Sequence, residues 1–261
     1  MKKTFIGNWK MNPQSLKEAQ DLVNVVDEVL VKEGSNPNLD IIFCPPFIFL
    51  ENIIAMSNLS KSSQGFMVGA QNLAIENSGA YTGEISGQML TGLGILSVII
   101  GHSERRWKLN ESDEVINKKL KSAILNNIIP IICFGEKVRG DSSKEEISKQ
   151  IQSTFQGIDF KDLKKMYVTY EPVWAISANS GAEVDNPKNA SNSIDFIKNY
   201  IKDNFDTGST QIDFIYGGSV NFDNVNGLIL ENNIDGVLVG GASVRKEDLS
   251  KLIDAMNRLT K

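Results

Sequence analysis

Three ionisable side chains stand where an apolar run gives way to a loop. Lys10 comes shortly after the run TFI, Glu171 follows MYVTY, and His102, the single histidine of the chain, follows VIIG. A lysine at such a place must be paired or face a site, because a buried unpaired ammonium is costly. A carboxylate there can serve as a general base. Each position also fits a plainer role: a solvated loop lysine, a structural histidine, an ordinary surface loop after Glu171.

The residues that follow His102 and Glu171 indicate what each side chain could do. Ser103 and Glu104 have the pattern of a helix start, and the positive end of a helix favours a neutral imidazole at His102, which can still donate a hydrogen bond. Glu171 is followed by a rigid Pro-Val-Trp turn and then by the small, polar stretch 177–182, a composition typical of a lid over a site.

Two glycine pairs complete the set of candidate site residues. They occur in YGGSV (216–220) and VGGAS (239–243), each after an apolar run. Paired glycines let the backbone approach a ligand and point successive N–H groups at a phosphate, and they also make ordinary tight turns. Two pairs after the last two runs favour a phosphate site.

The elements that would position these residues alternate regularly along the chain. Apolar, β-branched runs predict eight strands, at residues 4–6, 40–44, 66–70, 97–100, 128–133, 166–170, 211–216 and 236–239. Stretches with a 3.6-residue apolar period predict helices between them, at residues 15–31, 112–125, 143–155, 189–204, 222–230 and 245–259. Ser15 and Glu18 have the spacing of a capping box at the first helix.

Eight units in 261 residues leave about 33 residues for each strand, helix and pair of loops. No linker or break in composition divides the series, so we expect one domain covering residues 1–261. Continuous apolar strands indicate a parallel sheet covered on both faces. We therefore predict an α/β fold, a single (β/α)8 barrel of eight parallel strands ringed by helices, with a doubly wound open sheet as the alternative. In a barrel, chemistry belongs at the carboxyl ends of the strands.

Composition narrows the partners and the compartment. The net charge is −5 and the pI is about 5.1, which gives no basis for nucleic-acid binding. Cys44 and Cys133 lie far apart in apolar runs, as expected of reduced, buried thiols rather than a disulfide or a metal site. The sequence shows no export signal and no run of apolar residues long enough to span a membrane. We expect a cytoplasmic protein.

The motifs GNWKMN, GAQN, YTGE, GHSERR, YEPVWAI, YGGSV and LVGGAS occur in this order between Gly7 and Ser243. In these motifs the chain resembles the triosephosphate isomerase family. The resemblance implies a (β/α)8 barrel that interconverts dihydroxyacetone phosphate and D-glyceraldehyde 3-phosphate through an enediolate. It implies no cofactor and no metal. A different phosphate-binding barrel enzyme, such as a sugar-phosphate epimerase or lyase, and a non-catalytic protein that kept the fold are the competing functions.

The resemblance also implies a role for individual residues. Glu171 matches the base that moves the proton, His102 the neutral electrophile, Lys10 the cation and Asn8 an amide donor. Three residues are expected close behind this group: Glu104, Ser103 and Cys133. The phosphate would be bound by backbone N–H groups of Ser177, Ser219, Gly240 and Gly241.

Two further segments bear on the family pattern. The stretch from Asn77 to Ser86, NSGAYTGEIS, matches the interdigitating loop through which family members form homodimers, with Thr82 entering the neighbour's site. The lid tip departs from the family: Ser177-Ala178-Asn179-Ser180 replaces the usual Gly-Thr-Gly-Lys, which narrows the conformations open to the tip. We expect activity to survive and the lid kinetics to differ.

Overall fold

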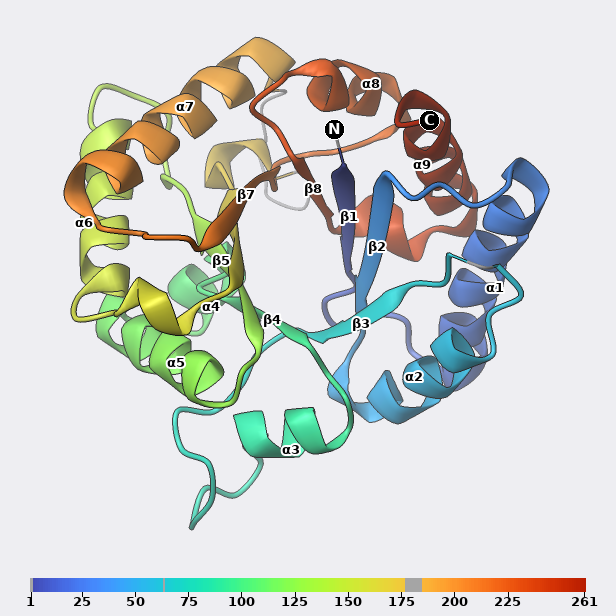
Figure 1. Ribbon diagram of the computed structural model, residues 1–261, viewed down its shortest axis with the longest axis horizontal. Helices are drawn as coiled ribbons and strands as arrows, with labels where there is room; N and C mark the ends of the chain where they lie inside the picture. Colours follow the sequence, from blue (N-terminus) through green and yellow to red (C-terminus); the bar gives the residue numbers. More distant parts are fainter. Residues whose placement is uncertain (1, 63, 177–184) are drawn as a thin grey trace.

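The computed structural model describes residues 2–62, 64–176 and 185–261. Within these residues the chain alternates strands and helices, with the helices forming a ring outside the strands (Figure 1). The strands are β1 Lys3–Asn8, β2 Leu39–Cys44, β3 Met67–Ala70, β4 Ser97–Ile100, β5 Ile129–Phe134, β6 Lys165–Tyr170, β7 Gln211–Tyr216 and β8 Gly236–Val239. The α-helices are α1 Leu16–Glu33, α2 Leu50–Asn58, α3 Gly87–Gly92, α4 Ser103–Lys108, α5 Asp113–Leu125, α6 Ser143–Phe155, α7 Pro187–Asn204, α8 Phe222–Leu230 and α9 Lys246–Leu259.

The strands close into a parallel barrel in the order in which they occur in the sequence. The closing contact joins β1 to β8, with Thr4 opposite Gly236. A Cβ atom at Gly236 would lie 2.0 Å from the carbonyl oxygen of Thr4, so the two strands pair this closely because residue 236 has no side chain. The closed barrel confirms the predicted fold, and the open doubly wound sheet is wrong.

Two apolar layers hold the barrel together. The inner layer fills the barrel with side chains from most of its strands: Ile6, Ile42, Cys44, Ile99, Ile131, Cys133, Tyr167, Ile215 and Leu238. The outer layer lies between the strands and the helices and includes the aromatic residues Phe5, Phe43, Phe134 and Phe155. Because adjacent side chains of a strand point to opposite faces, strands apolar on both faces bury residues in both layers.

The helices follow the predicted periodicity closely. The Ser15 hydroxyl oxygen accepts a hydrogen bond from the backbone N–H of Glu18 at the start of α1, as the capping pattern predicts. The short helices α2 and α3 were not predicted, because nine and six residues carry too little periodic signal. None of the helices in the described part of the chain is long and apolar enough to cross a membrane.

The segment between β3 and α3 leaves the compact body of the molecule. Figure 1 shows this loop extending well beyond the ring of helices. Tyr81 within this segment is 53% exposed, and Thr82 is also exposed. An aromatic side chain displayed on a projecting loop has no partner within the barrel to cover it.

Candidate active site

A cavity of about 380 Å³ opens at the carboxyl ends of the barrel strands. Residues from β1, β4, β6, β7 and β8 or the loops that follow them line it, among them Asn8, Lys10, His102, Glu171, Gly217, Gly218, Ser219, Gly240 and Gly241. The structure therefore brings together the candidate residues of all the strand-end motifs that lie within its described part. Ser177 and the altered lid tip lie outside the described residues.

Lys10 is held in an unusual backbone conformation. Its φ angle is 55°, in the left-handed region that a residue with a side chain rarely adopts. The side chain of Asn8 accepts a hydrogen bond from the Lys10 backbone N–H at 3.0 Å, and the Gln71 side chain donates to the Lys10 carbonyl at 2.8 Å. Contacts on both sides fix this conformation, as is usual where strain serves a functional site.

The ammonium group of Lys10 lies between two other candidate residues. Its Nζ is 3.1 Å from Oε1 of Glu104, which keeps the side chain extended toward the cavity. On the other side, a Cβ atom at Gly240 would lie 3.0 Å from Cε and 3.3 Å from Nζ of Lys10. The lysine side chain thus packs directly on the glycine of the second pair, and the absence of a side chain at residue 240 leaves room for it.

His102 caps the short helix α4 with its imidazole ring. Its Nδ1 accepts a hydrogen bond from the backbone N–H of Glu104 at 3.2 Å, so Nδ1 carries no proton in this arrangement. Its Nε2 is 2.9 Å from Oε1 of Glu171, within hydrogen-bond distance. This hydrogen-bond pattern assigns the Nε2–H tautomer of a neutral ring, the form that the helix start favours.

Glu171 is 2% exposed and follows β6. Besides the contact with His102, its Oε2 accepts from the backbone N–H of Ser103 at 2.8 Å and its Oε1 from the Ser103 hydroxyl at 3.0 Å. Burial raises the pKa of Glu171, but hydrogen bonds from His102 and from the Ser103 backbone N–H, together with the charge of Lys10, outweigh it and hold the pKa below its ordinary value. The carboxylate is ionised and engaged with protein donors.

Three further candidate residues lie near this group. Ser103 contacts Glu171, Glu104 contacts Lys10, and Cys133 lies in the interior of the barrel below them. Burial and the charge of Glu171 raise the pKa of the Cys133 thiol well above its ordinary value, so it remains a neutral thiol.

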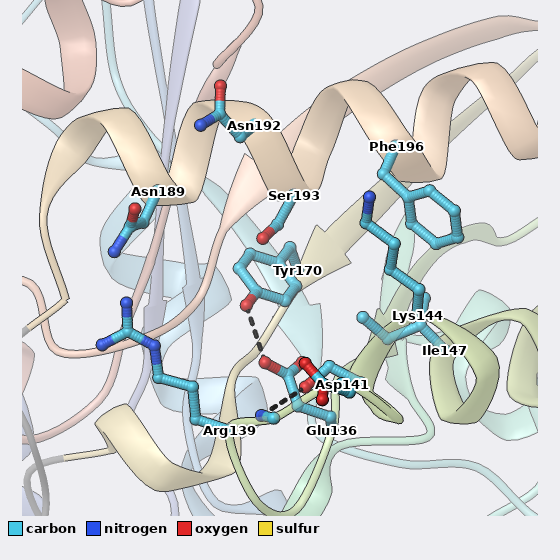
Figure 2. A pocket seen from close by; sticks show the side chains of 12 residues that line it. Glu136, Arg139, Asp141, Lys144, Ile147, Tyr170, Asn189, Asn192, Ser193 and Phe196 are labelled. Carbon is cyan, nitrogen blue, oxygen red and sulfur yellow. Dashed lines mark hydrogen bonds between the residues drawn. The ribbon is translucent and has the colours of Figure 1, made fainter.

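Several residues that shape the site carry no chemical signal in the sequence. A Cβ atom at Gly135 would lie 1.9 Å from the carbonyl oxygen of Glu171, so this glycine allows the two chain segments to meet. Glu136, which is 3% exposed, accepts hydrogen bonds from the Tyr170 hydroxyl at 3.0 Å and from Trp174 Nε1 at 2.7 Å. Figure 2 shows the Tyr170 hydroxyl pointing to Glu136. Only the fold brings these segments together.

The described residues contain no cluster of three or more His, Cys, Asp or Glu side chains that could hold a metal ion. What the site does present is a buried carboxylate beside a neutral imidazole, with an ammonium on the same cavity and glycine-rich loops across from it. A closed parallel barrel with this set of groups defines a class: enzymes that move a proton on a small anionic substrate by general acid–base catalysis.

Comparison with known proteins gives the particular family. The triosephosphate isomerase family model matches residues 3–256. A triosephosphate isomerase of Alkaliphilus oremlandii is 39% identical over 261 residues, covering 97% of this chain and 100% of the relative. A triosephosphate isomerase of Clostridium botulinum (strain Loch Maree / Type A3) is 37% identical over 252 residues, covering 95% of this chain and 97% of the relative. The chain belongs to the triosephosphate isomerase family.

Proposed function

We infer that this protein interconverts dihydroxyacetone phosphate and D-glyceraldehyde 3-phosphate, the reaction of its family and a step of glycolysis and gluconeogenesis. It is an intramolecular aldose–ketose isomerase, EC 5.3.1.1. The observation that carries the assignment of residues is the convergence of Glu171 and His102, 2.9 Å apart, on the cavity that Lys10 also lines.

Glu171 is the base in this proposal. Its carboxylate takes the proton from the carbon beside the carbonyl and returns it to the neighbouring carbon, so the enzyme is unchanged after one turnover. In the structure both carboxylate oxygens are engaged with Ser103, and Oε1 also with His102. Substrate must therefore displace part of this network before the carboxylate can reach the carbon acid.

His102 and Lys10 stabilise the enediolate that forms between the two proton transfers. The Nε2–H of His102, which donates to Glu171 in the structure, donates to the substrate oxygen once substrate is bound. Lys10 contributes a positive charge and Asn8 an amide donor at the same oxygens. Donors that are already oriented stabilise developing negative charge without reorganising, and this is the largest single contribution in many enzymes.

The phosphate is bound by backbone N–H groups of Ser219, Gly240 and Gly241, together with Ser177. Gly240 and Gly241 line the cavity, and Lys10 lies against Gly240 as the neighbouring full positive charge. Ser219 also lines the cavity, but its backbone N–H donates to the carbonyl of Ala175 at 3.1 Å. It becomes a phosphate donor only when that hydrogen bond is released.

We also propose a homodimer formed through the loop from Asn77 to Ser86. Support comes from the projection of this loop, which Figure 1 shows, and from the exposure of Tyr81 within it. Thr82 beside it is exposed and free to reach a second copy of the chain.

Two buried thiols, Cys44 and Cys133, fit a reducing compartment, and we propose that the protein acts in the cytoplasm.

A coupled assay for dihydroxyacetone phosphate formation tests the assignment of the base. Glu171→Gln keeps the shape of the side chain but cannot accept a proton, and loss of a general base typically lowers kcat by about 10²–10⁴-fold. Glu171→Asp shortens the side chain and should lower kcat less. Glu145→Gln is the matched control, because Glu145 is an exposed carboxylate paired with Lys149. Wild-type turnover no faster than that of Glu171→Gln would contradict the proposal.

A further inference from the structure

Tyr216, the last residue of β7, packs on the loop that the proposed function assigns to the phosphate. It is 1% exposed and immediately precedes Gly217-Gly218-Ser219. A Cβ atom at Gly218 would lie 2.3 Å from the Tyr216 hydroxyl oxygen and 2.6 Å from Cζ. The chain therefore turns back over the end of its own tyrosine ring. Any shift of that ring must move the peptide groups of residues 217–219.

A carboxylate outside the catalytic group fixes the end of this ring. The Tyr216 hydroxyl donates to Oδ2 of Asp185 at 3.1 Å, and Asp185 is 6% exposed. The other oxygen, Oδ1, accepts from the backbone N–H of Asn186, the residue that caps α7. The tyrosine hydroxyl is thus tied through Asp185 to the start of an 18-residue helix, a rigid element of the barrel's outer ring.

The Tyr216 ring also lies near the end of the strand that precedes the base. Tyr216 lies opposite Tyr170 in the register of β6 and β7, with ring centroids 6.2 Å apart. The Tyr170 hydroxyl is in turn held by Glu136, as Figure 2 shows. Because Tyr170 directly precedes Glu171, the ring pair spans the distance between the catalytic base and the phosphate loop.

We propose that Asp185 is a positioning residue for the phosphate-binding loop: by accepting the Tyr216 hydroxyl proton in a hydrogen bond, it holds the tyrosine against Gly218. This proposal rests on the proposed function, in which Ser219 of this loop binds the phosphate. Without Asp185 the hydroxyl would be left buried and unpaired, a state that costs free energy and drives the ring toward another partner. Asp185 itself does not touch the substrate.

The test compares substrates with and without the phosphate. Asp185→Ala removes the acceptor, Tyr216→Phe removes the donor, and Asp185→Asn keeps an acceptor oxygen at the same place. For each variant we would measure kcat and KM with D-glyceraldehyde 3-phosphate, turnover of phosphate-free D-glyceraldehyde, and inhibition by inorganic phosphate. Tyr200→Phe is the control, because it removes a tyrosine hydroxyl that donates to Gln152 and belongs to α7, outside the residues that line the cavity.

We expect Asp185→Ala and Tyr216→Phe each to raise the inhibition constant of inorganic phosphate about tenfold, the scale of one hydrogen bond to a charged group. KM for D-glyceraldehyde 3-phosphate should rise, while turnover of D-glyceraldehyde stays within about twofold of the wild type. The double variant should be no worse than either single one, because both remove the same hydrogen bond. Asp185→Asn should restore phosphate binding, and Tyr200→Phe should leave it unchanged.

Each contrary outcome points to a different error. If inorganic phosphate inhibits the wild type but binds equally well to Asp185→Ala and Tyr216→Phe, the positioning role is wrong and the proposed function stands. Equal losses with and without the phosphate group would show a general structural role and also overturn the inference. If inorganic phosphate does not compete with substrate in the wild type, the phosphate site of the proposed function is itself wrong. Tyr216→Phe decides the question should Asp185→Ala fail to fold.

Discussion

Ser103 controls how strongly the proposed base holds its negative charge. Its backbone N–H and its hydroxyl both donate to the Glu171 carboxylate, at 2.8 and 3.0 Å. Substituting Ser103→Ala removes the hydroxyl and leaves the backbone donor and the His102 contact in place. Hydrogen bonds to the ionised form lower the pKa of an acid. The substitution should therefore raise the pKa of Glu171 in the free enzyme.

The size of the shift follows from the number of donors left on the oxygen. A hydrogen bond to a charged group contributes about 1.5–3 kcal/mol, and each pKa unit corresponds to about 1.36 kcal/mol. The hydroxyl shares Oε1 with Nε2 of His102, which lies at 2.9 Å and keeps that oxygen partnered. We therefore take the lower end of the range and expect the pKa of Glu171 to rise by about one unit.

The pH dependence of kcat/KM tests this directly. Glu171 works as a base only when ionised, so activity is lost as pH falls through its pKa, and kcat/KM reports the pKa of the free enzyme. The acid limb should move up by about one unit in Ser103→Ala. The substrate phosphate also titrates, near pH 6, but it does so equally for both enzymes and cancels in the comparison. Coincident acid limbs for wild type and Ser103→Ala would refute the reasoning.

Stability gives a second measurement with a defined sign. The pKa of Glu171 is lower in the folded than in the unfolded chain. Its ionised form therefore stabilises the fold at pH values above the unfolded pKa, near 4.3. This contribution is lost as pH falls through the pKa of the folded state. Ser103→Ala should therefore lower the free energy of unfolding by about 1.4 kcal/mol more near neutral pH than in acid. Ser191→Ala is the matched control, since that buried hydroxyl donates to Asn233 at 2.9 Å, away from the site, and its effect should not vary with pH in this way.

Three further predictions concern the site, the barrel closure and the assembly. Lys10→Gly should lower kcat/KM by about 10²–10³-fold. It should not lower the free energy of unfolding measured in urea, because glycine relieves the positive φ at residue 10. A large loss of stability would contradict this. Gly236→Ala should destabilise the fold by about 3 kcal/mol or more through its clash with Thr4, whereas Gly92→Ala, with no atom within 4 Å of the new Cβ, should not. Tyr81→Glu should convert a dimer to monomers in sedimentation velocity; a monomeric wild type at micromolar concentration would reject the dimer.

The barrel could be predicted because its strands carry a strong local signal. Each reads as a short apolar run, and the observed strands differ from the predicted ones by at most two residues at either end. Closure could not be predicted from these runs, since neither end strand reveals its partner. The structure shows the physical reason for closure at Gly236, where the lack of a side chain lets β8 approach β1. A lone glycine in a strand can equally mark a bulge, a tight bend or a ligand contact, so by itself it does not indicate closure.

The sequence predicts which residue types lie at the strand ends of the candidate site. It does not predict the hydrogen bonds between them. Lys10, His102 and Glu171 stand out because ionisable groups directly after apolar runs need a partner or a function. That Glu171 accepts from Ser103, or that Asp185 accepts from Tyr216, depends on side-chain orientation across elements far apart in the sequence. No pattern along the chain encodes such contacts, because they arise only when the helices dock.

In the loop after β7, a feature that the sequence predicts is modified by a hydrogen bond that only the structure shows. The glycine pair at residues 217 and 218 predicts a backbone free to bind an anion, but in the structure the N–H of Ser219 donates to Ala175, next to the stiff turn that follows Glu171. Binding a phosphate at this N–H therefore exchanges one hydrogen bond for another, and the net gain is smaller than that of a free donor. The same exchange releases Ala175. In the proposed function, phosphate binding at Ser219 is therefore coupled to the turn that follows the base.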